Sequence, residues 1–194
     1  MEKRRVMDPD AKRAAVLGSA EKLFASEGYE RATMASVARE AGVAVGTVYR
    51  LFPDKSALLA ALHRRLEDQF LAAMAEGWAA AERPRERFAP MLAAVLREAA
   101  RRRAVMPLYA LTSPLLTGSY QPGARMIEAI VAQYAEGVAT GEFRPIAPHI
   151  VGPVAHAMVE GGLRAFMAEP TQTRLQDVER ELTTLFNAAF LSQP

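Results

Sequence analysis

The chain has 194 residues, of which 51% are hydrophobic, a formal net charge of +2 and no cysteine. This length suffices for one large domain, or for a small domain and a medium one. The absence of cysteine excludes disulfides, thiolate metal sites and cysteine nucleophiles. No apolar run approaches the ~20 residues of a membrane-spanning helix, and no apolar signal core follows the basic N-terminus, so we expect a cytoplasmic protein without a membrane partner.

Charge is distributed unevenly along the chain. Residues 1–65 contain twelve Lys and Arg against eight Asp and Glu, whereas the remaining residues contain twelve against fourteen. A mildly basic N-terminal third indicates where an anionic polymer would bind. We expect residues 1–9 to form a flexible tail, in which Lys3, Arg4 and Arg5 either attract DNA or simply remain solvated.

The apolar pattern predicts an all-α protein, because alanine-rich segments repeat apolar residues every three or four positions and strand signals are nearly absent. The first helix is expected from Asp8-Pro9, capped by the Asp8 carboxylate, to Gly28. Two short helices follow, from Thr33 to Ala41-Gly42 and from about Val45 to Phe52.

A long fourth helix, residues 54–76, has Asp54 as its cap and an apolar residue at every fourth position. Further helices are expected from Arg83-Pro84 to Arg103, irregularly between Met106 and Pro122, from about Ala124 to Thr140, after Pro148 to Met167, and from a Thr173-x-x-Gln176 capping box onward. The total is about nine helices. We expect a head of residues 10–56, linked by the long helix to a body of residues 57–194.

Residues 34–53 have the pattern of a helix-turn-helix. Such a motif needs apolar residues where two helices face the core, a small residue at their crossing and glycine in the turn. The apolar positions are Val37, Ala41, Val43, Val48 and Leu51. The small residue is Ala38, and the glycine of the turn is Gly42. An ordinary helical hairpin in an alanine-rich chain matches part of this pattern by chance.

The next residues carry a more specific resemblance. Ala44-Val45-Gly46-Thr47-Val48-Tyr49-Arg50-Leu51-Phe52, followed by Lys55 and Leu58, is similar to the signature of the tetracycline-repressor (TetR/AcrR) family of bacterial regulators. The likeness runs from about residue 10 to 70. It departs from the family pattern at Val45, where a small hydroxyl residue is frequent, and at Leu51, where an aromatic residue or histidine is common.

The resemblance implies a transcriptional regulator, most plainly a repressor, that binds a double-stranded DNA operator. Thr47 and Tyr49 match the phosphate-binding hydroxyls of the family, although Tyr49 also suits ordinary packing. Thr33 offers a hydroxyl and free N–H groups to a phosphate at a helix start, where it also suits an ordinary N-cap. Lys55 lies in the first turn of a helix, which is unfavourable for a cation, and a nearby phosphate would offset that cost. Arg50 is the long cation of the recognition helix and suits guanine or a phosphate, while Val45 suits a thymine methyl. The complete expected DNA-binding set is Thr33, Ala44, Val45, Gly46, Thr47, Tyr49, Arg50 and Lys55.

The resemblance also implies a homodimer and a small-molecule effector, apolar or amphipathic, whose binding releases the operator. The expected dimer interface is Val154, Met158, Gly161, Gly162, Leu175, Val178, Leu182, Leu185 and Phe186. The alternative is that these residues pack only against their own chain. The expected ligand pocket is Met74, Trp78, Met106, Tyr109, Met126, Tyr134, His156 and Phe166. Ordinary packing in the hydrophobic core is the alternative for each of these residues.

Other classes of function have less support in the sequence. The three histidines, His63, His149 and His156, do not form a metal-binding pair, and no phosphate loop or nucleophile elbow is present, so we expect no enzyme, metal or cofactor. A non-specific architectural DNA protein would carry far more positive charge. A helical active site in the body remains the alternative to a regulator.

Overall fold

The computed structural model describes residues 8–116, 121–169 and 171–192. Over these residues it contains nine α-helices, two short 3-10 helices and no strand, apart from one isolated bridge between Phe143 and Leu191. The all-α prediction is therefore confirmed. Lys3, Arg4 and Arg5 of the predicted tail lie outside the described residues.

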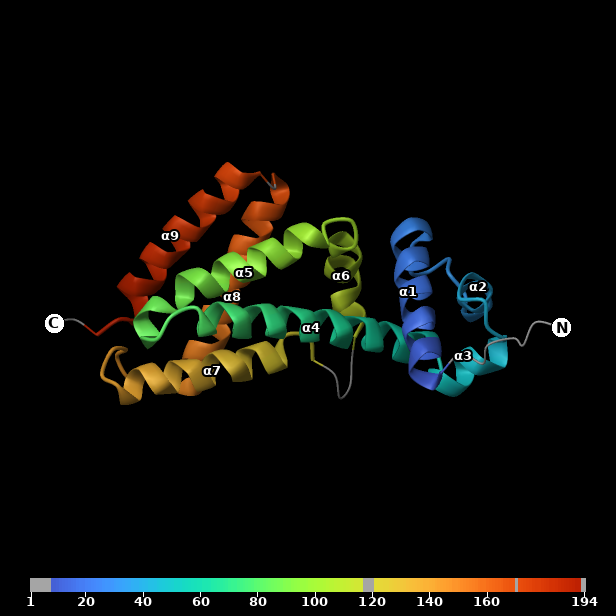
Figure 1. Cartoon of the computed structure of the whole chain (residues 1–194), viewed down its shortest axis with the longest axis horizontal. Coiled ribbons are helices and arrows are strands. Elements are labelled where there is room, and N and C mark those ends of the chain that lie inside the picture. Colours follow the sequence, from blue (N-terminus) through green and yellow to red (C-terminus); the bar gives the residue numbers. More distant parts are fainter. Residues whose placement is uncertain (1–7, 117–120, 170, 193–194) are drawn as a thin grey trace. The chain divides into compact units, whose positions relative to one another are not determined.

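The described chain divides into two compact units (Figure 1). Unit 1 comprises residues 8–65, 104–116 and 121, and unit 2 comprises residues 66–103, 122–169 and 171–192. Unit 1 holds α1 (Pro9–Glu27), α2 (Met34–Glu40), α3 (Val45–Leu51), the first part of α4 (Lys55–Ala79), α6 (Met106–Thr112) and the 3-10 helix η2 (Ser113–Leu115). The remainder of α4 belongs to unit 2.

Unit 1 is built around a small apolar core. Each of its helices buries apolar side chains at helical spacing, and among the most completely buried are Val16, Ala20, Phe24, Val37, Val48, Leu58 and Leu62. Burying a side chain of valine or leucine size contributes roughly 1.5–3 kcal/mol, so these positions stabilise the packing of α1, α2, α3 and the start of α4 in one core. α6 belongs to the same core, since Leu108 and Tyr109 are also buried.

Unit 2 holds η1 (Pro84–Glu86), α5 (Phe88–Arg101), α7 (Ala124–Ala139), α8 (Pro148–Ala168), α9 (Gln172–Phe190) and the end of α4. Nine of the fourteen residues of α5 are buried, which makes α5 the central helix of the unit. α8 packs against α7 and α9, and a glycine lies at each of these crossings. A Cβ atom at Gly152 would approach Val131 and Ile127 of α7, and one at Gly162 would overlap Leu182 of α9.

The helix caps agree with the sequence at α2 and α4 and differ at α1 and α9. The Asp54 carboxylate accepts a hydrogen bond from the Ala57 N–H at 2.7 Å, as expected for the start of α4. Asp8 precedes α1 but its side chain makes no capping bond. The predicted Thr173 capping box is wrong, because α9 begins earlier and the Thr171 hydroxyl accepts from the Arg174 N–H at 3.1 Å.

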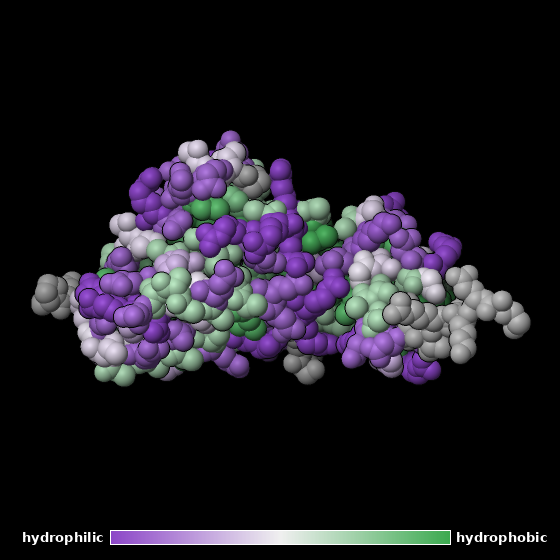
Figure 2. Space-filling view, in the orientation of Figure 1, coloured by the Kyte–Doolittle hydropathy of each residue, from purple (hydrophilic) through white to green (hydrophobic). Residues whose placement is uncertain are grey.

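The helix expected from Pro84 is instead the short η1 turn followed by α5. Side chains hold this turn: the Arg87 guanidinium donates to the carbonyls of Ala81 and Glu82, and the Glu142 carboxylate accepts from the Arg85 N–H. Figure 2 shows hydrophilic residues over most of the visible face, with apolar residues in scattered patches. No helix in the described part of the chain is long and apolar enough to span a membrane.

Candidate nucleic-acid interface and ligand cavity

α2, a tight turn and α3 form the helix-turn-helix. α2 ends in a Schellman motif, in which Gly42 has a φ of +66°, its N–H donates to the Arg39 carbonyl and the Val43 N–H donates to the Ala38 carbonyl. A left-handed conformation at this position costs glycine little. Val37, Ala38 and Val48 are buried where the two helices meet. The turn and the buried contacts thus fix the direction of α3.

Thr33 caps α2 through a reciprocal pair of hydrogen bonds. Its hydroxyl oxygen accepts from the Ser36 N–H at 3.0 Å, and its own N–H donates to the Ser36 hydroxyl at 3.0 Å. The Ser36 hydroxyl also donates to the Thr33 carbonyl at 2.8 Å. Because the Thr33 hydroxyl serves only as an acceptor in this cap, its hydrogen remains available to an anion. The N-cap role and a phosphate contact are therefore compatible.

One side of α3 is open to solvent. Ala44, Val45, Gly46, Tyr49 and Arg50 are exposed, whereas Val48 is fully buried and Thr47 is half-buried. Residues four positions apart share a helix face, so Val45 with Tyr49 and Gly46 with Arg50 form two adjacent rows. A Cβ atom at Gly46 would meet no atom within 4 Å. The exposed side of α3 is therefore a continuous surface with a flat point at Gly46.

The cations of unit 1 differ in whether they have partners within the chain. Lys22 pairs with Glu40 at 2.6 Å, Arg65 pairs with Glu21 at 2.6 Å, and Arg13 lies over the Phe52 ring at 4.5 Å. Arg50 has no hydrogen bond or ion pair within the described chain, which leaves its guanidinium available to a ligand.

Lys55 has two partners that the sequence did not predict. Its ammonium group lies 4.3 Å from the centre of the Tyr29 ring and donates to the Glu30 carbonyl at 3.1 Å. Burial, followed by the charges of Glu30 and Asp54, raises the pKa of Tyr29 above its ordinary value. A cation in the first turn of a helix is unfavourable, and these two contacts offset that cost for Lys55. A bound phosphate is therefore not needed to explain a lysine at this position. A DNA contact by Lys55 stays a prediction.

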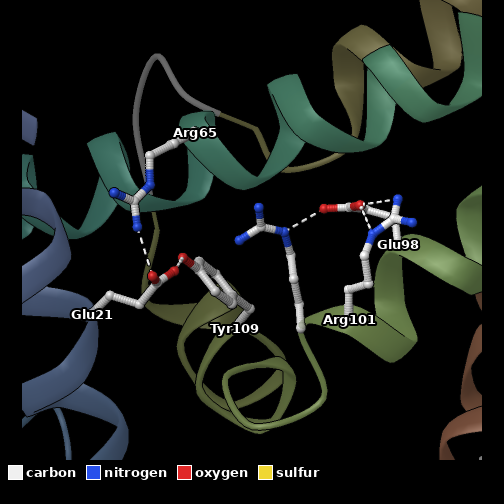
Figure 3. Close-up of polar contacts among 6 residues, drawn as sticks. Glu21, Arg65, Glu98, Arg101 and Tyr109 are labelled. Atoms are coloured by element: carbon white, nitrogen blue, oxygen red, sulfur yellow. Dashed lines mark hydrogen bonds and ion pairs between the residues drawn. The ribbon is translucent and has the colours of Figure 1, made fainter.

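α6 is joined to α1 and α4 by a polar cluster inside unit 1. The Glu21 carboxylate accepts from the Tyr109 hydroxyl at 2.5 Å and from the Arg65 guanidinium at 2.6 Å, as Figure 3 shows. On the same helix as Tyr109, Thr112 donates to the Leu108 carbonyl at 2.8 Å and lies 2.9 Å from Nε2 of His63. Since the Thr112 hydroxyl hydrogen is used by Leu108, we assign the Nε2–H donor to His63.

His63 is buried, with 5% of its surface exposed, and its ring lies edge-on to Tyr109. Burial lowers the pKa of His63 to about 4. The side chain is therefore neutral at pH 7, and its Nε2–H tautomer can donate to Thr112.

Unit 2 contains a cavity of about 40 Å³ among α4, η1, α5, α7, α8 and α9. Its lining is largely apolar and aromatic: Trp78, Pro84, Arg87, Phe88, Met91, Ile130, Gln133, Tyr134, Phe143, Ala155, Val159 and Phe186. Phe88 and Phe186 stack with ring centroids 4.0 Å apart, and Tyr134 stacks with Phe143 at 5.1 Å. The shape and lining resemble those of ligand pockets, although the space holds only a few water molecules.

The polar edge of this cavity is formed by Arg87 and Gln133. Arg87 donates to the Gln133 amide oxygen at 3.0 Å and to the Glu136 carboxylate at 2.6 Å, besides the two carbonyls of the η1 turn. The Tyr134 hydroxyl points elsewhere and donates to the Arg144 carbonyl at 2.7 Å. Burial raises the pKa of Tyr134, against the opposing charge of Arg144, so its hydroxyl stays protonated near neutral pH.

Two members of the predicted ligand set, Trp78 and Tyr134, line this cavity. Met74 and Phe166 are buried elsewhere in unit 2, and Met126 and His156 are half-buried outside the lining. Met106 and Tyr109 belong to unit 1. Sequence reasoning missed Phe88, Met91 and Ile130, whose signal was the apolar face of α5 and α7.

The predicted dimer residues also separate into two groups. Leu175, Val178 and Phe186 are buried within their own chain, and Gly162 lies at the close approach of α8 to Leu182. By contrast Val154, Leu185 and Gly161 are exposed and Met158 is half-exposed. Ile150, which sequence reasoning did not select, is 50% exposed and lies one turn before Val154. Ile150, Val154, Met158 and Gly161 thus form an apolar stripe on one side of α8.

The arginines at the end of α5 are engaged rather than simply solvated. Arg101 donates to the Glu98 carboxylate at 2.6 Å (Figure 3). Arg102 donates to the same carboxylate at 2.5 Å. Burial would raise the pKa of Glu98, but the hydrogen bonds and charges of the two arginines outweigh it and hold the pKa below its ordinary value. Among the described residues, no cluster of three or more acidic, histidine or cysteine side chains is arranged to hold a metal.

Comparisons with known proteins agree with this geometry. Residues 16–62 match the family model described as bacterial regulatory proteins, tetR family. A structure assigned to a tetR family transcription regulator from Shewanella sp. PV-4 has a TM-score of 0.80 at 25% identity, over 94% of this chain and 99% of that chain. A comparison with curated proteins finds no match.

Two further solved structures share the fold. The fatty acid degradation regulator FadR from Bacillus halodurans has a TM-score of 0.72 at 17% identity, over 91% of this chain and 94% of that chain. The ketosteroid transcriptional regulator KstR2 of Mycobacterium tuberculosis has a TM-score of 0.64 at 19% identity, over 95% and 97%. With the helix-turn-helix at residues 34–53, these findings identify residues 16–62 as a tetR-family DNA-binding segment in a chain that has the fold of tetR-family transcription regulators.

Proposed function

We propose that the protein is a repressor that binds a palindromic operator as a homodimer and is released by a small apolar or amphipathic ligand. The observation that carries the DNA-binding part is the exposed side of α3, where Arg50 has no partner within the described chain and Val48 anchors the opposite side in the core. A recognition helix held in this way presents the same side chains to every site it meets.

We assign roles to the exposed residues by their chemistry. Arg50 reads a guanine through its N7 and O6 atoms, and Val45 contacts a thymine methyl. Thr33, Thr47, Tyr49 and Lys55 contact phosphates, which fix register without reading sequence. Ala44 and Gly46 let the backbone at the start of α3 approach the DNA closely. Residues 10–56 carry this activity, and residues 57–194 carry sensing and dimerisation.

The apolar stripe of α8, together with Leu185 of α9, supports the dimer. These side chains are exposed in the single chain although they are apolar, and burying them against a second copy is favourable. A symmetric pair places two recognition helices on two half-sites, which is why the operator is expected to be palindromic.

The unit 2 cavity supports the ligand. Its lining is apolar with one polar edge, which suits a small molecule that is largely apolar. Two structures with the same fold are named as a ketosteroid transcriptional regulator and as a fatty acid degradation regulator. Repression is favoured over activation because release by a ligand needs only a loss of operator affinity.

Selection of DNA from a random pool tests the proposal. We expect a palindromic site, and substitution Arg50→Ala should weaken binding to it by about 5- to 100-fold and relax specificity at one base pair per half-site. Arg39→Ala is the matched control, because Arg39 is an exposed arginine of α2 in the same unit. Its loss should weaken all sequences alike. The proposal fails if no palindrome is recovered. It also fails if Arg50→Ala, like Arg39→Ala, loses affinity without any change of specificity.

A further inference from the structure

The unit 2 cavity has a polar edge whose hydrogen-bonding capacity is one-sided. Arg87 carries five N–H donors and no acceptor. Four of them are used, by the Ala81 and Glu82 carbonyls, the Gln133 amide oxygen and the Glu136 carboxylate. The fifth, on Nη2, has no partner within the described chain.

The oxygens of the other polar side chains in the lining already take part in hydrogen bonds. The Gln133 amide oxygen is engaged by Arg87, which leaves the amide NH₂ group to donate. The Tyr134 hydroxyl is directed to the Arg144 carbonyl. A ligand that enters this cavity therefore meets N–H donors without partners at its polar edge, whereas the side-chain oxygens there already take part in hydrogen bonds.

The same edge is electrically balanced. Arg87 is the only charged residue of the lining, and its guanidinium is paired with Glu136 at 2.6 Å. A carboxylate ligand placed beside Arg87 would face the Glu136 carboxylate, and two like charges close together repel. Burying an anion in the aromatic remainder of the cavity would cost more, since nothing there solvates it.

We infer that the cavity binds a neutral, largely apolar molecule with one hydrogen-bond acceptor, such as a ketone, ester or lactone oxygen, held by Arg87 and Gln133. The inference rests on the proposed function for the role of the cavity as the effector site. The apolar part of the ligand lies against Phe88, Phe143 and Phe186. Since the cavity is only about 40 Å³, the ligand displaces side chains, and Met91 and the half-buried Trp78 are the adaptable ones.

The chain contains a probe for this event, because Trp78 is its only tryptophan and lines the cavity. The experiment titrates the full-length protein with 4-phenylbutan-2-one and with 3-phenylpropanoate, and follows Trp78 fluorescence. The two compounds have nearly the same shape, and one carries a methyl ketone where the other carries a carboxylate. We expect the ketone to bind at least tenfold more tightly.

Two variants of α7 separate charge balance from general effects. Glu136→Gln removes the partner of Arg87, so the carboxylate should gain affinity and the preference for the ketone should shrink at least fivefold. Glu128→Gln is the matched control, since Glu128 is an exposed glutamate of the same helix outside the lining. It should leave the preference unchanged. Both substitutions are at exposed positions and leave the core intact.

Several outcomes would overturn the inference. These are tighter binding of the carboxylate by the wild-type protein, an equal effect of the two glutamate variants, and binding of neither compound. Operator selection needs no ligand and therefore tests the proposed function separately. A palindromic operator combined with failure of the titrations removes the neutral-ligand inference alone, whereas failure to recover an operator removes the proposed function.

Discussion

Gly46 is the second residue of α3, and its surroundings do not require glycine there. A Cβ atom there meets nothing within 4 Å, and its φ is not in the left-handed region. Glycine inside a helix costs roughly 0.5–1 kcal/mol relative to alanine. The free energy of unfolding is therefore lowered by this residue with no packing benefit inside the chain, which points to a benefit in the complex with DNA.

Substitution Gly46→Ala separates the two effects. We expect the free energy of unfolding to rise by about 0.5–1 kcal/mol while operator affinity falls, because the added methyl group lies where the backbone approaches DNA. Chemical denaturation and operator titration measure the two quantities. Alanine at Gly18 of α1, another glycine with open space around it, is the control and should raise stability without changing affinity. Unchanged affinity in Gly46→Ala would contradict a close approach at this point.

His63 makes the stability of unit 1 depend on pH. Its pKa is about 4 in the folded chain, against about 6.5 for an ordinary histidine. Between these values the unfolded chain binds the proton and the folded chain does not, so stability falls as pH falls from 6.5 towards 4.

The change His63→Gln keeps an N–H donor for Thr112 but cannot be protonated. Between pH 7 and pH 4.5 the wild type should lose about 2 kcal/mol more of its free energy of unfolding than the variant. Denaturant unfolding at a series of pH values measures the difference, which cancels the carboxylate titrations common to both proteins. Parallel pH curves for the two proteins would show that His63 is not held neutral by burial.

Residue-level prediction from the sequence succeeded where chain-local chemistry decides and failed where partners come from distant segments. The caps at Thr33 and Asp54 and the turn at Gly42 depend on neighbours within a few positions, and their residue types were enough to find them. The partners of Lys55 could not be found in this way, because Tyr29 and Glu30 lie about 25 positions away.

At the scale of elements, α6 is the helix whose place could not be read from the sequence. Pro107 and the nearby Pro114 predicted an irregular segment of the body, yet α6 makes contacts with α1 and α4 in unit 1. Along the chain α6 follows α5 and precedes α7, and both of these helices line the unit 2 cavity. α5 contributes Phe88 and Met91 to the lining, and α7 contributes Ile130. The packing of α6 against α1 and α4 depends on charge and burial between segments that are far apart in the sequence. Helical periodicity does not encode such contacts.

Two tyrosines allow the place of α6 to be tested. Tyr109 and Tyr134 are each 4% exposed, and each donates one hydrogen bond, to Glu21 in unit 1 and to the Arg144 carbonyl in unit 2. Tyr109→Phe should raise amide hydrogen exchange in α1 and the start of α4 and leave α7 and α8 unchanged. Tyr134→Phe should do the reverse. The cost of each is expected to be about 1–3 kcal/mol.

The outcome for α5 and α7 decides this prediction, because they are the neighbours of α6 along the chain. If Tyr109→Phe increases exchange in α5 and α7 as strongly as in α1, then α6 is part of unit 2 in solution and its assignment to the DNA-binding unit is wrong. Exchange in α2 and α3 reports how far the loosening reaches the recognition helix.

At the scale of the whole molecule, the proposed dimer depends on the apolar stripe of α8. Val154 is 46% exposed and lies in the middle of the stripe. Val154→Glu should leave the fold intact, convert the dimer to a monomer and reduce operator affinity by at least tenfold, since a charge at the centre of an apolar interface is costly. Sedimentation velocity and operator titration measure the two effects.

Ala132→Glu provides the comparison, because Ala132 is an exposed alanine of α7 outside the stripe. It adds the same charge to the same unit and should change neither mass nor affinity. A Val154→Glu protein that remains dimeric would move the interface elsewhere on the surface. The sequence predicted the apolar residues of α8 and α9 as a group, but only the structure separates the exposed ones from those that bury within one chain.

The division of the chain between its two units has a practical consequence for exchanging DNA-binding specificity between relatives. Grafting only the first 65 residues of another regulator would leave Tyr109, Thr112 and Leu108 facing a foreign Glu21 and His63. The graft would then carry unmatched buried polar groups, each of which costs about 1–3 kcal/mol. A functional chimaera should therefore exchange residues 104–116 together with the N-terminal segment, although residues 66–103 of unit 2 separate the two in the sequence.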